Sequence, residues 1–180
     1  MTARLEMSAG SFVLRPLARE DVTERYLSWM RDPSVTRTLM AHRQEQSLDS
    51  IAAYVARHDN VRGYLFGVFA PGIGHIGNFS LWHYPEDERA TIGVMVGEKA
   101  FWGKDVVLPC RARLLDFIFD DLGCQKVAAG CLSNNAAAVF NFRKQGWVHE
   151  GTRRRQYRFD GQFRDELFFA MFAEDWRTRR

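Results

Sequence analysis

Three strand-like segments joined by short turns lie in the middle of the chain, and they constrain its fold more than any other feature. Strand patterns run over 63–70, 73–83 and 90–96. The dipeptide Pro71-Gly72 predicts a hairpin turn between the first two segments, and a run of proline and acidic residues, 85–88, turns the chain into the third. The sequence therefore predicts a meander of three antiparallel strands.

The segments on either side of the meander define the fold class. Before it, the pattern predicts a strand over 11–17, a helix over 18–31 and a helix capped by Ser47. After it, the predicted elements are a helix over 104–122, a strand over 126–132, a helix over 135–145, and strands over 147–157 and 163–172 joined by Asp160-Gly161. This order predicts one α+β, or mixed α/β, domain over residues 1–180, built on a sheet of about seven strands.

Charge is distributed unevenly along the chain. The formal net charge of +3 is too small to indicate nucleic acid, and we expect no nucleic-acid partner. A basic segment near the C-terminus is more informative, because a local basic surface suits an anionic small molecule such as a nucleotide or a phosphate ester. Its arginines are Arg153, Arg154, Arg155, Arg158 and Arg164.

The cysteines and the hydrophobic runs indicate the compartment. Cys110, Cys124 and Cys131 are odd in number and lack metal-type spacing, which favours buried thiols in a reducing compartment and no bound metal. The N-terminus lacks the features of a secretory signal, and no run approaches the roughly 20 apolar residues of a membrane span. We therefore expect a cytoplasmic protein without a membrane partner.

The passage TIGVMVGEKAFWGKDVV, residues 91–107, joins a strand directly to the start of a helix through a glycine-containing loop. Unpaired backbone N–H groups and the positive end of the helix dipole converge at such a joint, and this suits a phosphate or pyrophosphate. Lys104 adds a cation there. On local physics alone, an ordinary connection with a surface lysine is an equally good interpretation.

Two segments resemble the signature motifs of the GNAT superfamily of acyl-CoA N-acyltransferases: Val94 to Val107, and NAAAVFNFRKQGW at 135–147. The resemblance is strongest to the branch that includes ribosomal-protein N-terminal and nucleotide-sugar N-acetyltransferases. Supporting segments are LRPLAREDV, WMRDPSVTRTL, HIGNFSL and GQFRDELFFAM. The resemblance implies a single GNAT-like domain with a mostly antiparallel sheet, in which strand 92–96 splays from strand 126–132. It also implies acetyl-CoA as co-substrate, and no metal.

The resemblance further implies a donor site along the splayed strand. The backbone of this strand would bind the pantetheine arm, the following loop would cradle the pyrophosphate, and an asparagine would lie near the arm. That asparagine is equally well interpreted as a helix N-cap. The implied residues are Val94, Met95 and Val96 in the strand, Trp102, Gly103, Lys104, Asp105, Val106 and Val107 in the loop, and Asn135.

Four positions depart from the family pattern. Asp105 and Val107 stand where the loop usually carries a second glycine and a small residue. Phe142 stands at the position of a tyrosine that serves as the acid in many relatives, and Ala138 replaces a serine that is common in this branch. These departures keep an alternative open, namely a catalytically weak or inactive acyl-CoA-binding module.

The proton-transfer groups and the acceptor are less constrained. His83 and Glu88 are the candidate catalytic bases, since both lie near the cleft-forming strands, although either could be an ordinary polar residue at a strand end. We expect a primary amine to attack the thioester directly. The acceptor is either a nucleotide-linked amino sugar, with Arg154 and Arg158 binding its phosphates, or a peptide or protein N-terminus. Relatives often form dimers, so the resemblance also implies a homodimer.

Overall fold

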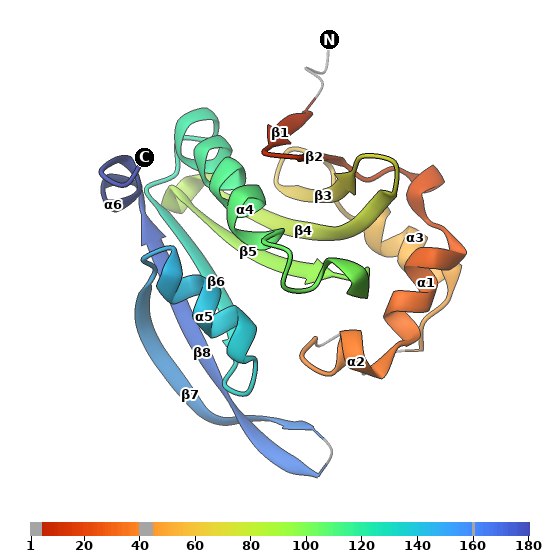
Figure 1. Cartoon of the computed structure of the whole chain (residues 1–180). Helices are drawn as coiled ribbons and strands as arrows, with labels where there is room; N and C mark the ends of the chain where they lie inside the picture. Colours follow the sequence, from red (N-terminus) through yellow and green to blue (C-terminus); the bar gives the residue numbers. More distant parts are fainter. Residues whose placement is uncertain (1–4, 40–44, 160) are drawn as a thin grey trace.

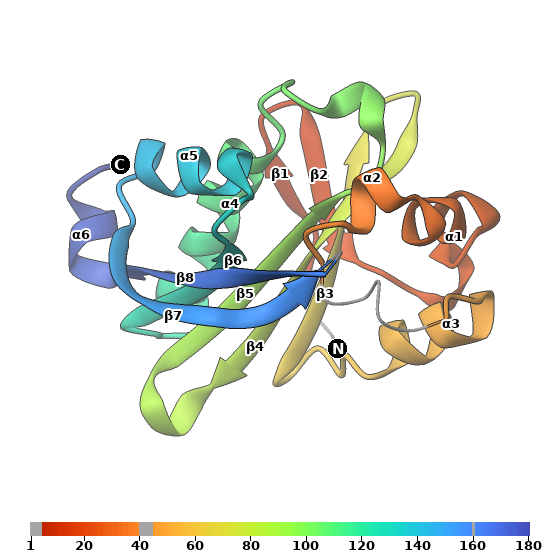
Figure 2. The same ribbon diagram turned by 90° about the horizontal axis from the view of Figure 1, so that it is seen from below.

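The computed structural model of the chain describes residues 5–39, 45–159 and 161–180. They form one sheet of eight strands in the order β1-β2-β3-β4-β5-β6-β8-β7, with helices on both faces (Figures 1 and 2). The strands are β1 Met7–Ala9, β2 Phe12–Pro16, β3 Gly63–Ala70, β4 Gly74–Tyr84, β5 Arg89–Val96, β6 Lys126–Leu132, β7 Val148–Phe159 and β8 Gln162–Phe172.

The helices are short, and the longest of the described α-helices has 10 residues. The α-helices are α1 Glu24–Arg31, α2 Pro33–Thr36, α3 Leu48–Ala56, α4 Val107–Asp116, α5 Ala136–Lys144 and α6 Ala173–Arg177. Short 3₁₀ turns are η1 Arg19–Asp21, η3 Pro85–Asp87 and η4 Lys99–Phe101, and a π turn, η5 Phe117–Asp121, follows α4.

The mixed α/β architecture and the central meander are confirmed, and one strand was missed. Strand β1 pairs antiparallel with β2, Met7 opposite Leu14, because Gly10 at φ +62° turns the chain back after only three residues of strand. So short a segment has too few residues to show an alternating pattern. Asp160 of the predicted hairpin turn lies outside the described residues, while Gly161 has φ +76°.

The first predicted helix begins later than the sequence pattern suggested. Instead of one helix over 18–31, the chain forms η1 and then α1, which Thr23 caps by accepting from the Tyr26 N–H at 3.3 Å. Asp21 stabilises the start of η1, since its carboxylate accepts hydrogen bonds from the Ala18 N–H and from the Arg15 guanidinium. Ser47 caps α3 as predicted, accepting from the Ser50 N–H at 3.1 Å.

The sheet separates two hydrophobic clusters. Helices α4 and α5 cover one face, where Leu114 and Phe142 pack with Phe79 of β4; we call it the α4–α5 face. Helices α1 and α3 cover part of the other, where Leu27 packs in a cluster with Met95 of β5; we call it the α1–α3 face. The α1–α3 helices lie over the β2–β5 half of the sheet, and β6, β8 and β7 extend beyond them (Figure 2).

Strands β5 and β6 form the parallel pair of the sheet, and they separate after three residue pairs. Their register ends at Thr91 opposite Ala128, although β5 continues to Val96 and β6 to Leu132. Each strand stays with its own outer neighbour: Val96 still pairs with Gly77 of β4, and Leu132 with Glu166 of β8. The predicted splay is therefore confirmed, and we call the gap beyond Thr91 the β5–β6 opening (Figure 1).

Candidate active site

The backbone of β5 presents alternate residues to the β5–β6 opening. Glu88 directs its carbonyl towards β6, where it accepts from the Gln125 N–H at 2.6 Å, while Gly97 donates towards β4, to the Ile76 carbonyl at 3.0 Å. Backbone groups alternate in direction along a strand. Ile92, Val94 and Val96 therefore turn their N–H and C=O groups into the opening. A pantetheine arm with amide groups could bind along this edge.

Met95 is the exception among the three strand residues predicted to bind the cofactor. By the same alternation its backbone faces β4, where its carbonyl oxygen lies against Gly77. Its side chain is buried in the cluster of the α1–α3 face. The structure thus brings Val94 and Val96 to the opening, and it does not bring Met95 there.

The loop that follows β5 forms a concave set of N–H groups before α4. Gly103 and Asp105 have left-handed φ values of +72° and +52°, and Val106 returns to the right-handed region at φ −72°. Such alternation is typical of anion-binding hollows, and the positive end of the α4 dipole adds to the attraction for an anion. The Trp102 and Lys104 N–H groups already donate within the loop, to the Lys99 and Phe101 carbonyls. Pro109 costs nothing in the first turn, where no N–H partner is needed.

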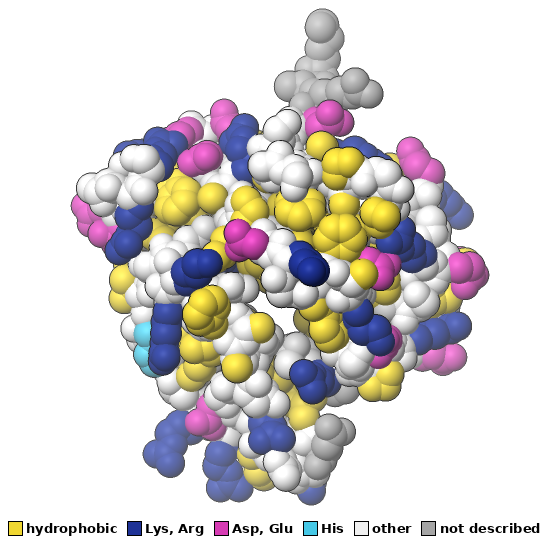
Figure 3. All heavy atoms as spheres, in the orientation of Figure 1, with side chains coloured by type: hydrophobic (Ala, Val, Ile, Leu, Met, Phe, Trp, Pro, Cys, Tyr) yellow, Lys and Arg dark blue, Asp and Glu magenta, His cyan; other side chains and the backbone are white. Residues whose placement is uncertain are grey.

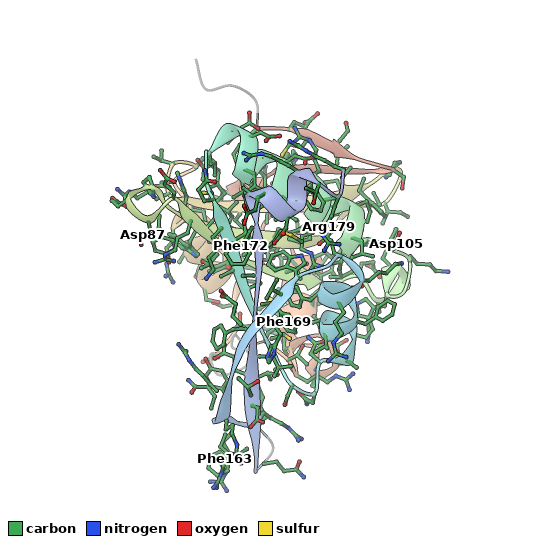
Figure 4. The ribbon with its side chains drawn as sticks, turned by 90° about the vertical axis from the view of Figure 1, so that its left-hand side faces the viewer. Asp87, Asp105, Phe163, Phe169, Phe172 and Arg179 are labelled. Carbon is green, nitrogen blue, oxygen red and sulfur yellow. The ribbon has the colours of Figure 1, made fainter. Side chains whose placement is uncertain are left out.

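The side chains of this loop contribute less than its backbone. Asp105 is exposed and does not cap α4, since the cap residue is Val106, which makes no side-chain cap bond. Figure 4 shows Asp105 at the margin of the molecule. Lys104 is also exposed, whereas Val106 is buried and Val107 packs against the α4–α5 core. Trp102 donates from its indole nitrogen to the Val96 carbonyl at 2.8 Å and so ties the loop to β5.

Asn135 lies just beyond the open end of β6. Its side-chain oxygen accepts from the Ala138 N–H at 3.1 Å, and its own N–H donates to the Leu132 carbonyl. The predicted N-cap role is therefore confirmed. A contact with a pantetheine arm stays a prediction, which the position of Asn135 beside the opening supports.

Two glycines flank the opening on the α1–α3 face. Gly93 of β5 and Gly130 of β6 are both exposed, each two residues beyond the last residue pair, Thr91 and Ala128. A Cβ at Gly93 would lie 2.9 Å from the Ser80 hydroxyl oxygen. Ser80 shares a hydrogen bond with Tyr54 of α3, whose pKa is raised by burial. We call Gly93 and Gly130 the glycine pair; neither residue places a side chain over the opening on this side.

The β7–β8 hairpin borders the opening with arginines. It extends away from the body of the molecule to a tip at Phe163, and Lys and Arg side chains gather over this tip beside a hollow in the surface (Figures 3 and 4). Arg154 is exposed, and Arg158, also exposed, donates to the Gly161 carbonyl at 3.4 Å. Their strand does not alternate regularly, because the register shifts between Arg153 and Tyr157.

Residues 11–148 match the sequence model of the family described as the acetyltransferase (GNAT) domain. The chain belongs to the GNAT acetyltransferase family. Its fold and its donor-side geometry agree with this assignment, and it is an acetyl-CoA-dependent acyltransferase of the N-acetyltransferase type. Among the described residues, no group of three His, Cys, Asp or Glu side chains could hold a metal ion, and no helix is long and apolar enough to cross a membrane.

Similar proteins support the family but do not specify the acceptor. A Bacillus subtilis (strain 168) protein named "Probable N-acetyltransferase YjcK" is 26% identical over 128 residues, which are 69% of this chain and 70% of that protein. The spermidine N-acetyltransferase of Vibrio cholerae, solved with CoA and spermine, has a TM-score of 0.81 at 19% identity, over 92% of this chain and 98% of that one. A GNAT-family acetyltransferase from Bacillus anthracis has a TM-score of 0.80 at 16% identity, over 94% and 99%.

The position of the GNAT tyrosine is occupied by a core residue. Phe142 is 4% exposed and stacks on Phe169 with ring centroids 4.6 Å apart, and the Arg111 guanidinium lies 4.5 Å from the centroid of its ring. Its side chain has no proton to give to a departing thiolate. The acid of this GNAT enzyme therefore comes from another residue or from water.

Arg111 is a buried cation that the sequence analysis missed. It is 2% exposed, stacks on Phe142 and Trp147, and donates to the Gln145 side-chain oxygen at 2.5 Å and to the Asn141 carbonyl at 2.8 Å. Burial lowers its pKa to about 9, so it stays protonated at neutral pH. It fixes α4 against α5 beside the loop that precedes α4. The available signal in the sequence was its place three residues after Leu108 and four before Leu115, the spacing of one helix face.

His83 and Glu88, the predicted bases, lie where β5 and β6 are still paired. His83 pairs with Ala90, and Glu88 precedes β5 in a left-handed conformation at φ +48°. Figure 4 shows the neighbouring Asp87 at the margin opposite Asp105. The structure brings neither candidate to the opening. His75 and Phe79 of β4 lie on opposite faces of the sheet although they are four residues apart, because an irregularity in the β3–β4 register at Ile76 interrupts the alternation.

None of the three cysteines has the properties of an acyl-accepting nucleophile. Cys110, Cys124 and Cys131 are free thiols. Burial raises their pKa values to about 12, 11 and 11, respectively, so each is protonated at neutral pH. This supports direct attack by the amine on the thioester.

Proposed function

We propose that this GNAT enzyme acetylates a primary amine on an anionic carrier, most simply a nucleotide-linked amino sugar. The observation that carries the proposal is the arginine-rich β7–β8 hairpin beside the β5–β6 opening (Figure 3). Residues 152–166 contain five arginines and three acidic residues, Asp160, Asp165 and Glu166. A surface with this excess of positive charge attracts phosphate groups.

The same charge disfavours a polyamine acceptor. The similar Vibrio cholerae protein is named for spermidine and was solved with spermine. A polyamine carries several positive charges, and each would be repelled by about 0.4 kcal/mol per arginine at roughly 10 Å in water. A protein N-terminus carries one charge and is the second acceptor class. An acidic segment after that N-terminus would suit the hairpin.

On the donor side, we propose that the Val94 and Val96 backbone groups bind the pantetheine arm. The loop from Trp102 to Val107 holds the pyrophosphate through its N–H groups, and Lys104 supplies a cation. Asn135 lies near the arm. The open edge of β5, the alternating φ values of the loop and the α4 N-terminus support these roles.

Acetyl transfer then needs one proton acceptor and one proton donor. The amine loses a proton, its nitrogen forms the new C–N bond at the thioester carbonyl, and the C–S bond breaks. The leaving thiolate takes a proton to become the thiol of coenzyme A. His83 and Glu88 remain candidate bases only through ordered water, because they lie at the paired end of β5 and β6.

An acceptor screen tests the proposal. Purified protein is given acetyl-CoA with nucleotide-linked amino sugars, peptides or polyamines, and released thiol is measured. We expect the highest kcat/KM with a nucleotide-linked amino sugar. Highest activity with a polyamine would refute the anionic carrier, and no detectable binding of acetyl-CoA at millimolar concentration would refute the enzyme.

Arginine variants then test the role of the hairpin. Arg154→Ala and Arg158→Ala should raise KM for the nucleotide sugar about 5- to 20-fold, as expected when a charged hydrogen bond to phosphate is lost. Arg143→Ala, which removes an exposed arginine from α5, is the matched control. If the two substitutions raise KM equally for an amino sugar that carries no phosphate, the hairpin does not recognise phosphate.

A further inference from the structure

Glu166 of β8 lies beside the glycine pair. It pairs with Leu132 of β6, and its carboxylate bends over the neighbouring Gly130, where an added Cβ would lie 3.1 Å from Oε1 and 3.6 Å from a ring carbon of Phe168. The side chain is 17% exposed. The absence of a side chain at Gly130 is what gives this carboxylate its place at the rim of the opening.

The hydrogen-bonding capacity of Glu166 is incompletely used. Its Oε2 is buried and accepts no hydrogen bond from the described residues. The Arg153 guanidinium on β7 is 3.8 Å away, close enough to attract the carboxylate but too far for a hydrogen bond, and it is itself 62% exposed. Buried carboxylate oxygens normally have a donor. An ammonium group entering the opening would supply one.

The position of Glu166 relative to the donor site favours an acceptor role. The N–H groups of the pyrophosphate loop and the α4 N-terminus belong to the α4–α5 side of the sheet. The α1–α3 face of β6 and β8, where Gly130, Phe168 and Glu166 lie, is left for the acceptor. Across the opening, Ser80 and Tyr54 stand beside Gly93.

The geometry points to Glu166 as the carboxylate that binds the acceptor's ammonium group and takes its proton. This inference rests on the amine acceptor of the proposed function, and not on the anionic carrier. An N–H proton of the ammonium passes to the Glu166 carboxylate, which leaves a neutral amine with a free electron pair. The nitrogen then bonds to the thioester carbon, and the thiolate leaves and takes up the second proton, which the nitrogen sheds. Glu166 finally releases its proton to water.

The other charged and titratable groups around Glu166 are few. Arg153 faces it from β7, Arg164 precedes it by two residues on β8, and Cys131 lies on β6. Burial, and secondarily the Glu166 charge, raises the Cys131 pKa to about 11, so this thiol does not compete as a base. The two arginines are cations and cannot accept the proton.

The test compares three variants with the acceptor that reacts fastest in a panel of primary amines. Glu166→Gln keeps the shape but removes the base, and we expect kcat/KM for the amine to fall about 100-fold or more, as for loss of a general base. Its Kd for acetyl-CoA should stay within 2-fold. Gly130→Ala, which crowds the carboxylate, should give a smaller loss, and Glu166→Asp should recover part of the activity. Raising the pH, which deprotonates the amine in solution, should rescue Glu166→Gln more than the wild type.

A matched control separates charge from position. Glu150→Gln removes a carboxylate of the same hairpin that pairs with Lys126 at 2.6 Å, at the paired end of β6, and it should leave amine kinetics within 2-fold. Gly151→Ala, with no atom within 4 Å of its Cβ, is the glycine control. Thermal unfolding of each variant verifies that it folds.

The outcomes are distinguishable. Unchanged kcat/KM, or an unchanged pH profile, in folded Glu166→Gln would overturn the role of Glu166. Suppose that Glu166→Gln lowers kcat/KM 100-fold for a primary amine on an uncharged carrier, and that the wild type does not act on anionic carriers. This result would uphold the role of Glu166 and refute the proposed carrier. If no amine in the panel reacts with the wild type, the proposed function and this inference both fall.

Discussion

The Trp102 indole nitrogen donates to the Val96 carbonyl oxygen at 2.8 Å, and this bond ties the loop of the proposed pyrophosphate site to the open end of β5. The bond thereby fixes the position of the loop relative to the edge of β5, the two parts of the proposed donor site. Trp102→Phe keeps an aromatic ring and removes the donor. We expect Kd for acetyl-CoA to rise about 2- to 10-fold, as for the loss of one hydrogen bond. Calorimetry measures this, and an unchanged Kd would show that the loop is held in other ways.

Asp105 should weaken donor binding by its charge and destabilise the loop by its backbone conformation. Its φ of +52° is left-handed, which costs roughly 1–2 kcal/mol for a residue with a Cβ, and somewhat less for Asp or Asn. Asp105→Asn removes the charge alone, and Asp105→Gly also removes the strain. Both variants should bind acetyl-CoA more tightly, and only Asp105→Gly should raise Tm. A rise in Tm of equal size in both would contradict the role of backbone strain.

Arg111 should stabilise the protein mainly by filling space between α4 and α5. Arg111→Ala leaves a cavity beside Phe142 and Trp147 and should lower the free energy of unfolding by about 2–4 kcal/mol. Arg111→Met keeps most of the volume and removes a buried charge that has no carboxylate partner among the described residues, so it should cost much less. Urea unfolding compares the two. Equal losses would show that the hydrogen bonds to Gln145 and Asn141 dominate.

His75 should make the protein less stable in mild acid. It is enclosed by Tyr26, Trp29 and Phe69, and burial lowers its pKa to about 4 from an ordinary 6.5. Because the unfolded chain binds a proton at pH values where folded His75 does not, stability is complete above pH 6.5 and is lost as the pH falls towards 4. The loss approaches about 3 kcal/mol.

The variant His75→Phe isolates this contribution. Phenylalanine suits the aromatic surroundings and cannot titrate, so its unfolding free energy should fall less than that of the wild type between pH 6.5 and 4. Chemical denaturation at several pH values gives the comparison. Parallel curves for the two proteins would assign the acid sensitivity to other groups, of which the Asp21 carboxyl group interacts with His75.

Local patterns predicted the elements whose residues interact with near neighbours in sequence. The bounds of β6, the cap at Ser47 and the hairpin at Pro71-Gly72 depend on such patterns, and all are observed. The helix predicted to begin at residue 104 begins at Val107, as α4. Its start was mispredicted because left-handed Asp105 and the conformation of Val106 depend on the loop as a whole. The irregularity at Ile76 depends on the pairing with β3, so the alternation along β4 alone does not give the side of the sheet on which His75 lies.

The residues of the candidate site likewise differ in how far local sequence patterns could predict them. Val94, Val96 and the Trp102 to Val107 loop were named from the resemblance to the GNAT family, and their part in donor binding stays a prediction that the order of strand, loop and helix supports. Glu166 and Gly130 come from strands that are 36 positions apart in sequence and adjacent in the sheet, so no local motif joins them. His83 and Glu88 were chosen by closeness in sequence to the cleft strands, and the structure places them at the paired end instead.

The most direct test of the account is amide hydrogen exchange along β5, residue by residue, with and without acetyl-CoA. The Val94 N–H faces the β5–β6 opening, whereas the neighbouring Met95 N–H already faces β4. If the donor binds along this edge, acetyl-CoA will slow exchange at Val94 far more than at Met95. Equal exchange at Val94 with and without saturating acetyl-CoA would contradict the placement of the donor in the opening.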